Sequence, residues 1–70
     1  QDFIHVELVS KKKSDFNIYI FDEIGQAIYN RAYIGKSTLT DKFDLSQQPK
    51  GIYYISVYSE QQQMTHKIIK

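Results

Sequence analysis

Seventy residues suffice for one small domain, because a chain of this length buries only about 60% of the surface that its unfolded form exposes. The sequence has no cysteine, which excludes a disulfide framework, and its formal net charge of +1 is too small for the long-range field that binders of nucleic acid or membrane surfaces use. We therefore expect a single domain, residues 1–70, that is stabilised by aliphatic and aromatic packing and is recognised by its shape.

Apolar and polar residues alternate in two runs near the start of the chain. This period of two is the pattern of half-buried strands, and it predicts strands at residues 3–9 and 15–21. Lys11-Lys12-Lys13, between the two runs, is the only charge run, and we interpret it as a solvated hairpin tip. The alternating apolar positions are Ile4, Val6, Leu8, Phe16, Ile18 and Ile20.

Turn-forming residues divide the middle of the chain. Asp22 can accept hydrogen bonds from the backbone of a tight hairpin, and Gly25 supplies the positive φ that such a turn requires. A third strand is predicted at residues 26–33. Gly35 then breaks the pattern before a fourth strand at residues 37–45.

The strongest strand pattern lies in the last third of the chain. Pro49 and Gly51 indicate a turn, residues 51–59 form the strand that follows it, and a final strand of open register is predicted at residues 63–69. Six or so short strands and no helix predict an all-β fold, a small antiparallel immunoglobulin-like β-sandwich of about six to seven strands, with a partly open barrel as the alternative. The residues of the strongest strand that we expect in the core are Tyr53, Ile55 and Val57.

Residues that could carry catalysis or bind a metal are scattered. Gly35-Lys36-Ser37 lacks the earlier glycine and the following helix of a phosphate-binding loop. His5 and His66 are isolated, and Asp41 and Asp44 lack the spacing of a calcium loop. We interpret the Asp41 and Asp44 carboxylates as solvated groups on an edge-like strand. From this scatter we predict that the protein is not an enzyme and has no cofactor and no metal site.

Two surface features allow more than one interpretation. Lys67 and Lys70 flank Ile68-Ile69 at the end of the sequence, where a receptor could grasp the chain through its carboxylate and backbone, or where lysines could protect an edge strand from aggregation. Tyr54 and Tyr58 would suit flat contacts. They support an alternative function, an immunoglobulin-like or fibronectin-like adhesion or carbohydrate-binding module.

Four segments in order resemble one family. Ile20 to Ile28, Phe43-Asp44-Leu45-Ser46, Pro49 to Tyr53 and Lys67 to Lys70 together resemble the type A C-terminal sorting domain of the type IX secretion system, also called the Por secretion system. The resemblance implies a non-catalytic signal at the end of a larger protein from a Bacteroidetes-type bacterium. The implied role of this signal is to direct a passenger protein across the outer membrane.

The resemblance also implies partners and residue roles. The implied partners are the outer-membrane translocon, a sortase-like peptidase and the passenger of the same precursor. The resemblance also implies that the protein crosses the periplasm and reaches the outer membrane surface or the medium. Open sheet edges make a strand-swapped homodimer an additional expectation. The implied translocon-recognition residues are Lys67, Ile68, Ile69 and Lys70. The resemblance implies Gly25 and Gly51 as turn formers and Tyr53 as a core anchor. The turn and strand patterns add Pro49, Ile55 and Val57 to the predicted turn and core residues.

The chain departs from the family pattern in two places. It opens with Gln1-Asp2-Phe3-Ile4 rather than a segment of the Pro-Asn-Pro type, and it lacks an initiator Met, so we expect a fragment or a processed product. Gln48 stands where an apolar residue is usual. This change weakens one expected packing contact before Pro49.

Overall fold

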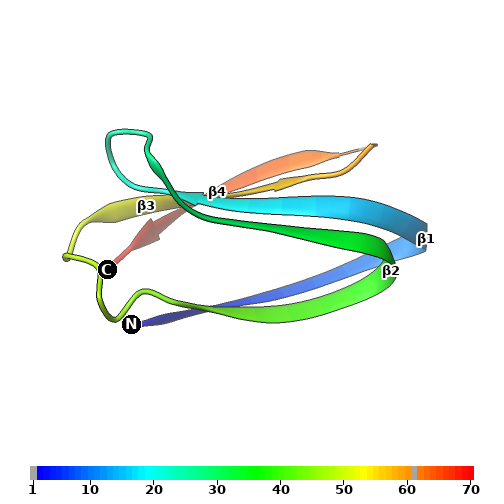
Figure 1. Ribbon diagram of the computed structural model, residues 1–70, viewed down its shortest axis with the longest axis horizontal. Coiled ribbons are helices and arrows are strands. Elements are labelled where there is room, and N and C mark those ends of the chain that lie inside the picture. Colours follow the sequence, from blue (N-terminus) through cyan, green and yellow to red (C-terminus); the bar gives the residue numbers. More distant parts are fainter. Residues whose placement is uncertain (1, 61) are drawn as a thin grey trace.

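The computed structural model describes residues 2–60 and 62–70, and within them four strands form one antiparallel sheet (Figure 1). The strands follow one another in the sheet in the order β2-β1-β3-β4. The predicted all-β, antiparallel architecture is confirmed. The described residues include no helix, and so no helix that could cross a membrane. The strands are β1 (Phe3–Phe21), β2 (Ala27–Asp44), β3 (Ile52–Tyr58) and β4 (Gln63–Ile69).

The described residues contain four strands rather than about six to seven, because β1 and β2 continue through two predicted connections. β1 has 19 residues and includes Lys11-Lys12-Lys13, and β2 has 18 residues and includes Gly35, whose φ is +63°. The β1–β2 register shifts on both sides of Ser14. Such bulges bend a strand and increase its twist, so the ladder turns a corner here without ending in a loop.

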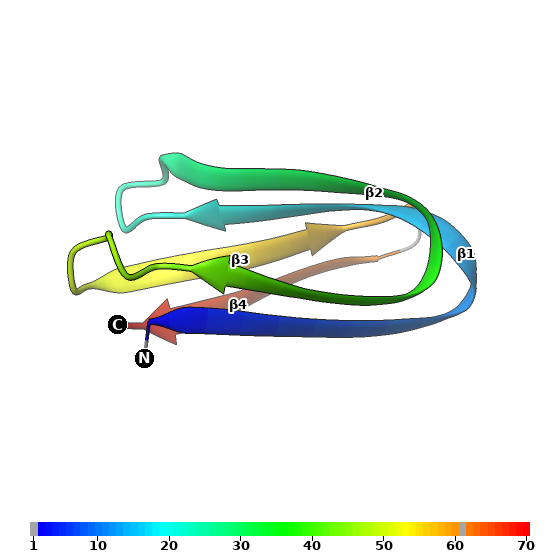
Figure 2. The same cartoon turned by 60° about the horizontal axis from the view of Figure 1, so that its bottom comes forward.

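The bend folds the sheet over itself. Figure 2 shows β1 and β2 curving back together at the end of the molecule that lies farthest from the marked termini. The half of the hairpin in which Phe3 pairs with Asp44 therefore faces the half that pairs with β3. The described residues form one continuous sheet, and the two separate sheets of an immunoglobulin-like sandwich are not seen.

The hydrophobic core lies between the two halves of the folded sheet. Ile18, Ile20 and Phe43 are completely inaccessible to solvent, and burial of a side chain of this size stabilises by about 1.5–3 kcal/mol. Tyr53, Ile55 and Val57 of β3 are all buried in the same cluster. The remaining core residues are Val6, Phe16, Leu39 and Leu45.

The turn between β1 and β2 has the predicted construction. The Asp22 Oδ1 atom accepts hydrogen bonds from the backbone nitrogens of Ile24 (3.1 Å) and Gln26 (2.9 Å). The Gly25 nitrogen donates to the Asp22 carbonyl oxygen at 3.0 Å, and Gly25 has a φ of +90°. A residue with a side chain rarely adopts that conformation, which explains the glycine.

The register of the last strand, which the sequence left open, is set by antiparallel pairing with β3. Tyr53 lies opposite Ile68, and Val57 lies opposite Met64, so Ile68 and Met64 share the inward face of the sheet. β4 is the last strand in the sheet order, and most of its residues are exposed. The fold therefore leaves β4 as an open edge.

Candidate functional site

The last four residues of the sequence differ in their exposure. Lys67 is exposed and Ile69 is 72% exposed, whereas Ile68 packs against the core and the Lys70 side chain is only 10% exposed. Successive side chains of a strand point to opposite faces of a sheet, which explains the alternation. The predicted recognition segment thus divides into two outward and two inward side chains.

Lys70 ties the end of β4 to two other parts of the chain. Its Nζ atom donates hydrogen bonds to the carbonyl oxygens of Leu45 (2.8 Å) and Gln48, and lies 3.9 Å from the Asp2 Oδ1 atom. The backbone of Lys70 exchanges two hydrogen bonds with Gly51, of 2.9 and 3.2 Å. An ammonium group held by carbonyl oxygens in this way is a fixed structural contact rather than a free charge.

The turn before β3 accepts these contacts. The Tyr53 hydroxyl donates to the Pro49 carbonyl oxygen, and the Gln48 nitrogen donates to the Leu45 carbonyl oxygen at 3.0 Å. Gln48, at the position where the family pattern has an apolar residue, is half-buried and offers its backbone carbonyl to Lys70. Gly51 has no positive φ, so its place beside Lys70 does not depend on the conformational freedom of glycine.

The outer face of β4 carries the exposed pair. Lys67 lies opposite Tyr54, and Ile69 lies opposite Ile52. Within residues 2–60 and 62–70, no strand pairs with the other side of β4. Its backbone groups along that side form an unpaired row next to one cationic and one large apolar side chain, which is the arrangement that an added strand can use.

Tyr54 and Tyr58 belong to an aromatic cluster on the outer face of the sheet. Tyr19 and Phe21 stack with ring centroids 5.7 Å apart, and Tyr58 meets Tyr19 edge to face at 5.6 Å. Tyr54 lies opposite Phe21 across β3 and β1. The Tyr19 ring therefore contacts the rings of both Phe21 and Tyr58, and all three side chains are half-buried.

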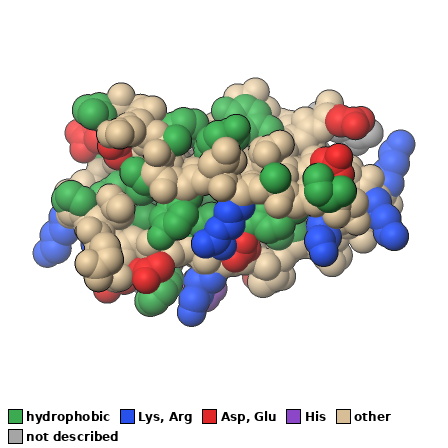
Figure 3. Space-filling view, viewed as in Figure 1, with side chains coloured by type: hydrophobic (Ala, Val, Ile, Leu, Met, Phe, Trp, Pro, Cys, Tyr) green, Lys and Arg blue, Asp and Glu red, His purple; other side chains and the backbone are tan. Residues whose placement is uncertain are grey.

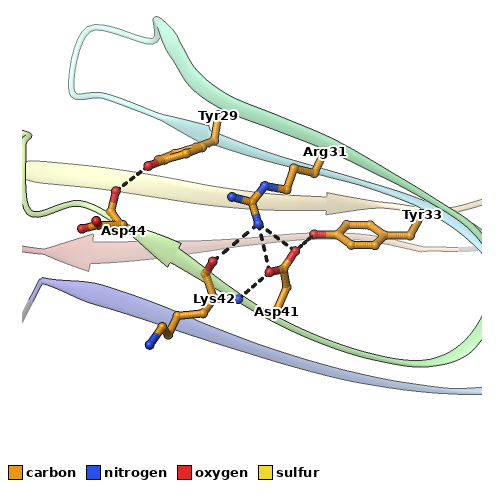
Figure 4. A network of polar contacts seen from close by, with 6 residues as sticks. All are labelled: Tyr29, Arg31, Tyr33, Asp41, Lys42 and Asp44. Atoms are coloured by element: carbon orange, nitrogen blue, oxygen red, sulfur yellow. Dashed lines mark hydrogen bonds and ion pairs between the residues drawn. The ribbon is translucent and has the colours of Figure 1, made fainter.

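A polar network lies along β2, on the side of the molecule where the space-filling view shows charged side chains among hydrophobic ones (Figure 3). The Arg31 Nη1 atom donates to both Asp41 oxygens, at 2.9 and 3.0 Å, and the Tyr33 hydroxyl donates to Asp41 Oδ2 (Figure 4). The Arg31 guanidinium also lies 4.4 Å from the centroid of the Phe43 ring. Arg31 and Asp41 belong to the two halves of the bent β2, so the network fastens the fold.

The network changes the pKa values of its members. The hydrogen bond from Tyr33, followed by bonds from the Lys42 nitrogen and Arg31, holds the pKa of Asp41 below its ordinary value of 3.8. Burial, with the hydrogen bond to Asp41, raises the pKa of Tyr33 to about 12. The interpretation of Asp41 as a solvated carboxylate was wrong, because the bend places its side chain, 22% exposed, between Arg31 and Tyr33.

The other titratable residues singled out in the sequence do not converge. His5 on β1 and His66 on β4 are both exposed. Asp44 is exposed, and hydrogen bonds from the Ser46 side chain and then from the Ser46 nitrogen, the latter of 2.8 Å, lower its pKa. Among the residues that the structure describes, no group of three or more His, Cys, Asp or Glu side chains could hold a metal ion.

The sequence was compared with known protein families, curated proteins and solved structures. A protein family described as the secretion system C-terminal sorting domain matches residues 1–70, which is the whole sequence. No curated protein and no solved structure matches the chain.

Proposed function

The chain belongs to the family of secretion system C-terminal sorting domains, non-catalytic signals for the type IX secretion system, and from this premise we propose that the export machinery binds its open β4 edge. A sorting signal of this kind directs export across the outer membrane, so its passenger reaches the cell surface or the medium. The observation that carries the proposal is the outward exposure of Lys67 and Ile69 beside an unpaired strand edge.

Recognition by strand addition suits this edge. In that mode the backbone of the receptor pairs with the free side of the strand, and side chains at alternate positions provide the specificity. Lys67 and Ile69 are two residues apart, so they project from the same face. We therefore assign specificity to these two side chains.

Ile68 and Lys70 have a different role in this proposal. Ile68 packs against the core, and Lys70 holds the carbonyl oxygens of Leu45 and Gln48. They fix the position of β4 against the rest of the domain. Presentation of the edge thus depends on the two inward residues, and its recognition depends on the two outward ones.

The proposal includes the route by which the passenger is exported. The passenger precedes this domain in the precursor and crosses the periplasm with it, the outer-membrane translocon takes hold of β4, and a sortase-like peptidase then acts on the precursor. The compact fold supports this order, because a folded signal can present one edge to a receptor without unfolding.

Export of a reporter tests the proposal. Residues 1–70 are fused behind a reporter that is directed to the periplasm of a host with this secretion route, and the reporter outside the cell is measured. We expect Lys67→Glu combined with Ile69→Asp to reduce export at least about tenfold, because an unfavourable contact buried against the receptor at each position costs about 1 kcal/mol or more.

Lys50→Glu is the matched control, because Lys50 is an exposed lysine in the turn before β3. It should leave export unchanged. The double variant should keep the thermal unfolding midpoint of the original chain, which separates recognition from folding. Normal export of a folded Lys67→Glu, Ile69→Asp variant would reject the β4 assignment while leaving family membership intact.

A further inference from the structure

A pocket is lined by residues of the β1 bend. This bend lies at the end of the molecule opposite the marked termini (Figures 1 and 2). The pocket has a volume of about 370 Å³, within the range of about 300–1,000 Å³ that is usual for small-molecule sites. Its walls come from the bend of β1 and from the β3–β4 end of the sheet. It is separate from the exposed Lys67 and Ile69, which do not line it.

The floor of the pocket is apolar. Phe16 and Val57 are core residues, only 8% and 7% exposed, and each contributes to the pocket wall. Leu8 and Met64 extend the apolar lining from β1 and β4, and Met64 is 36% exposed. The core is therefore accessible at this end, where the two halves of the sheet do not close over each other.

The rim of the pocket is polar and basic. Lys11 and Lys12 line it, and none of the described lining residues is acidic. The β1–β2 register shifts between Val9 and Ser14, so the bulged segment that bears the lysines leaves the regular ladder. Bulges often redirect side chains beside functional sites. In the space-filling view, basic side chains gather at this end, with some acidic side chains beside them outside the pocket lining (Figure 3).

We propose that this pocket binds a free, unbranched, medium-length fatty carboxylate. The alkyl chain lies on Phe16, Val57 and Met64, and the carboxylate meets the ammonium groups of Lys11 and Lys12. Lysine suits this position, because its methylene stem covers apolar surface while its charged end remains in water. An acid-free basic rim above an apolar floor selects a ligand with one anionic end and one apolar end.

Titration of the 70-residue chain with octanoate and decanoate, below their micelle concentrations, tests the proposal by calorimetry and by ¹H–¹⁵N spectra. Each added methylene should tighten binding about fourfold, which corresponds to about 0.8 kcal/mol per buried methylene. Decyltrimethylammonium has the same chain with the opposite charge, and it should bind about tenfold more weakly than decanoate. Resonances of Phe16, Val57 and Met64 should shift.

Substitutions at the rim and on the floor complete the test. Lys11→Glu with Lys12→Glu should weaken decanoate binding about tenfold, whereas Lys13→Glu, which makes the same charge change at a residue outside the lining, should change it less than about twofold. Met64→Glu should weaken binding without loss of the fold, since Met64 is partly exposed.

Three outcomes would overturn the proposal. Equal affinity for decanoate and decyltrimethylammonium would show unselective apolar binding. Equal effects of the Lys13→Glu and Lys11→Glu, Lys12→Glu variants would show a general charge effect. Binding to anionic phospholipid vesicles without saturable binding of free decanoate would identify a membrane-surface patch instead.

Discussion

The two edges of the sheet are built in opposite ways. On β2, the inward side chains Arg31 and Tyr33 reach across to Asp41 on the other half of the same strand, so their polar groups are satisfied within the domain. On β4, Lys67 and Ile69 point away from the domain, and the strand has no partner on its outer side within the described residues. One edge stabilises the fold, and the other remains available for recognition.

This division has a physical reason. An exposed strand edge invites pairing with other chains. β2 and β4 are both outer strands of the sheet, and the β2 edge is closed only in the sense that side chains join the two halves of the bent strand. The bend in β1 and β2 brings Arg31 and Asp41 together, although they are ten residues apart in the chain. β4 follows the last turn and lies outside that fold-over, so its outer edge pairs with no other strand of the described residues.

The largest expected effect comes from breaking the closed edge at Phe43. This ring is completely buried, lies edge to face with Tyr29 at 5.4 Å and is covered by the Arg31 guanidinium. Phe43→Ala should lower the free energy of unfolding by about 3–5 kcal/mol, because it leaves a cavity in a closely packed core. That is a large share of the stability expected of a domain of 70 residues, about 3.5–10.5 kcal/mol at about 0.05–0.15 kcal/mol per residue. Urea unfolding followed by circular dichroism measures it.

Ile69→Ala provides the matched substitution on the open edge. Ile69 is also large and apolar but is 72% exposed, so its truncation should change the free energy of unfolding by less than about 0.5 kcal/mol. A similar loss for the two variants would contradict the division into a stabilising edge and an available one.

An intermediate effect is expected from Asp41. Asp41→Ala removes the acceptor for Arg31, Tyr33 and the Lys42 nitrogen, and it should lower the free energy of unfolding by about 1–2 kcal/mol. The estimate is moderate because the Arg31 side chain is 41% exposed and regains water when its partner is lost. Glu7→Gln, at an exposed carboxylate of β1, should have almost no effect.

A double-mutant cycle separates the ion pair from the rest of the network. Arg31→Met and Asp41→Asn, alone and together, should give a coupling free energy of about 0.2–1 kcal/mol. A coupling of zero would mean that the Arg31–Asp41 contact does not fasten the two halves of β2.

Much of the fold could be predicted from the sequence where local rules decide the structure. Alternation around Ile18 and Ile20 placed one strand, and Asp22 with Gly25 placed the turn after it, because side-chain period and turn chemistry act over a few residues. The Lys11-Lys12-Lys13 segment was predicted wrongly as a hairpin tip. A bulged bend and a loop have the same polar composition, and only long-range pairing distinguishes them.

The features of the site that were missed depend on that same bend. Asp41 interrupts an apolar parity in the sequence, but its position on the inward face was itself a signal that a partner lay opposite, and the partner proved to be Arg31. Lys70 gave no comparable signal, because its acceptors are backbone carbonyl oxygens whose positions exist only in the folded turn. Its structural role therefore could not be read from residue types.

The smallest expected effect is the pH dependence of the closed edge. The pKa of Asp41 is lower in the folded domain than the ordinary 3.8, so the unfolded chain binds more protons in acid. The stabilising contribution of Asp41 is therefore present above about pH 4 and is lost as the pH falls through the folded pKa. The unfolding midpoint of Asp41→Asn should decline less steeply in acid than that of the original chain. Asp44, whose pKa is also lowered, is present in both proteins, so the difference isolates Asp41.

Tyr33 provides the alkaline counterpart. Its pKa is raised to about 12 in the folded domain, so stability is complete below the ordinary tyrosine pKa of about 10 and declines as the pH rises toward 12. Tyr33→Phe should flatten this decline, whereas Tyr58→Phe, on the outer face, should leave it in place. The contrary outcome is that the unfolding midpoints of Asp41→Asn in acid and of Tyr33→Phe in alkali change with pH in parallel with those of the original chain. Asp41 and Tyr33 would then titrate alike in the folded and unfolded states. The two edges of the sheet would not differ electrostatically.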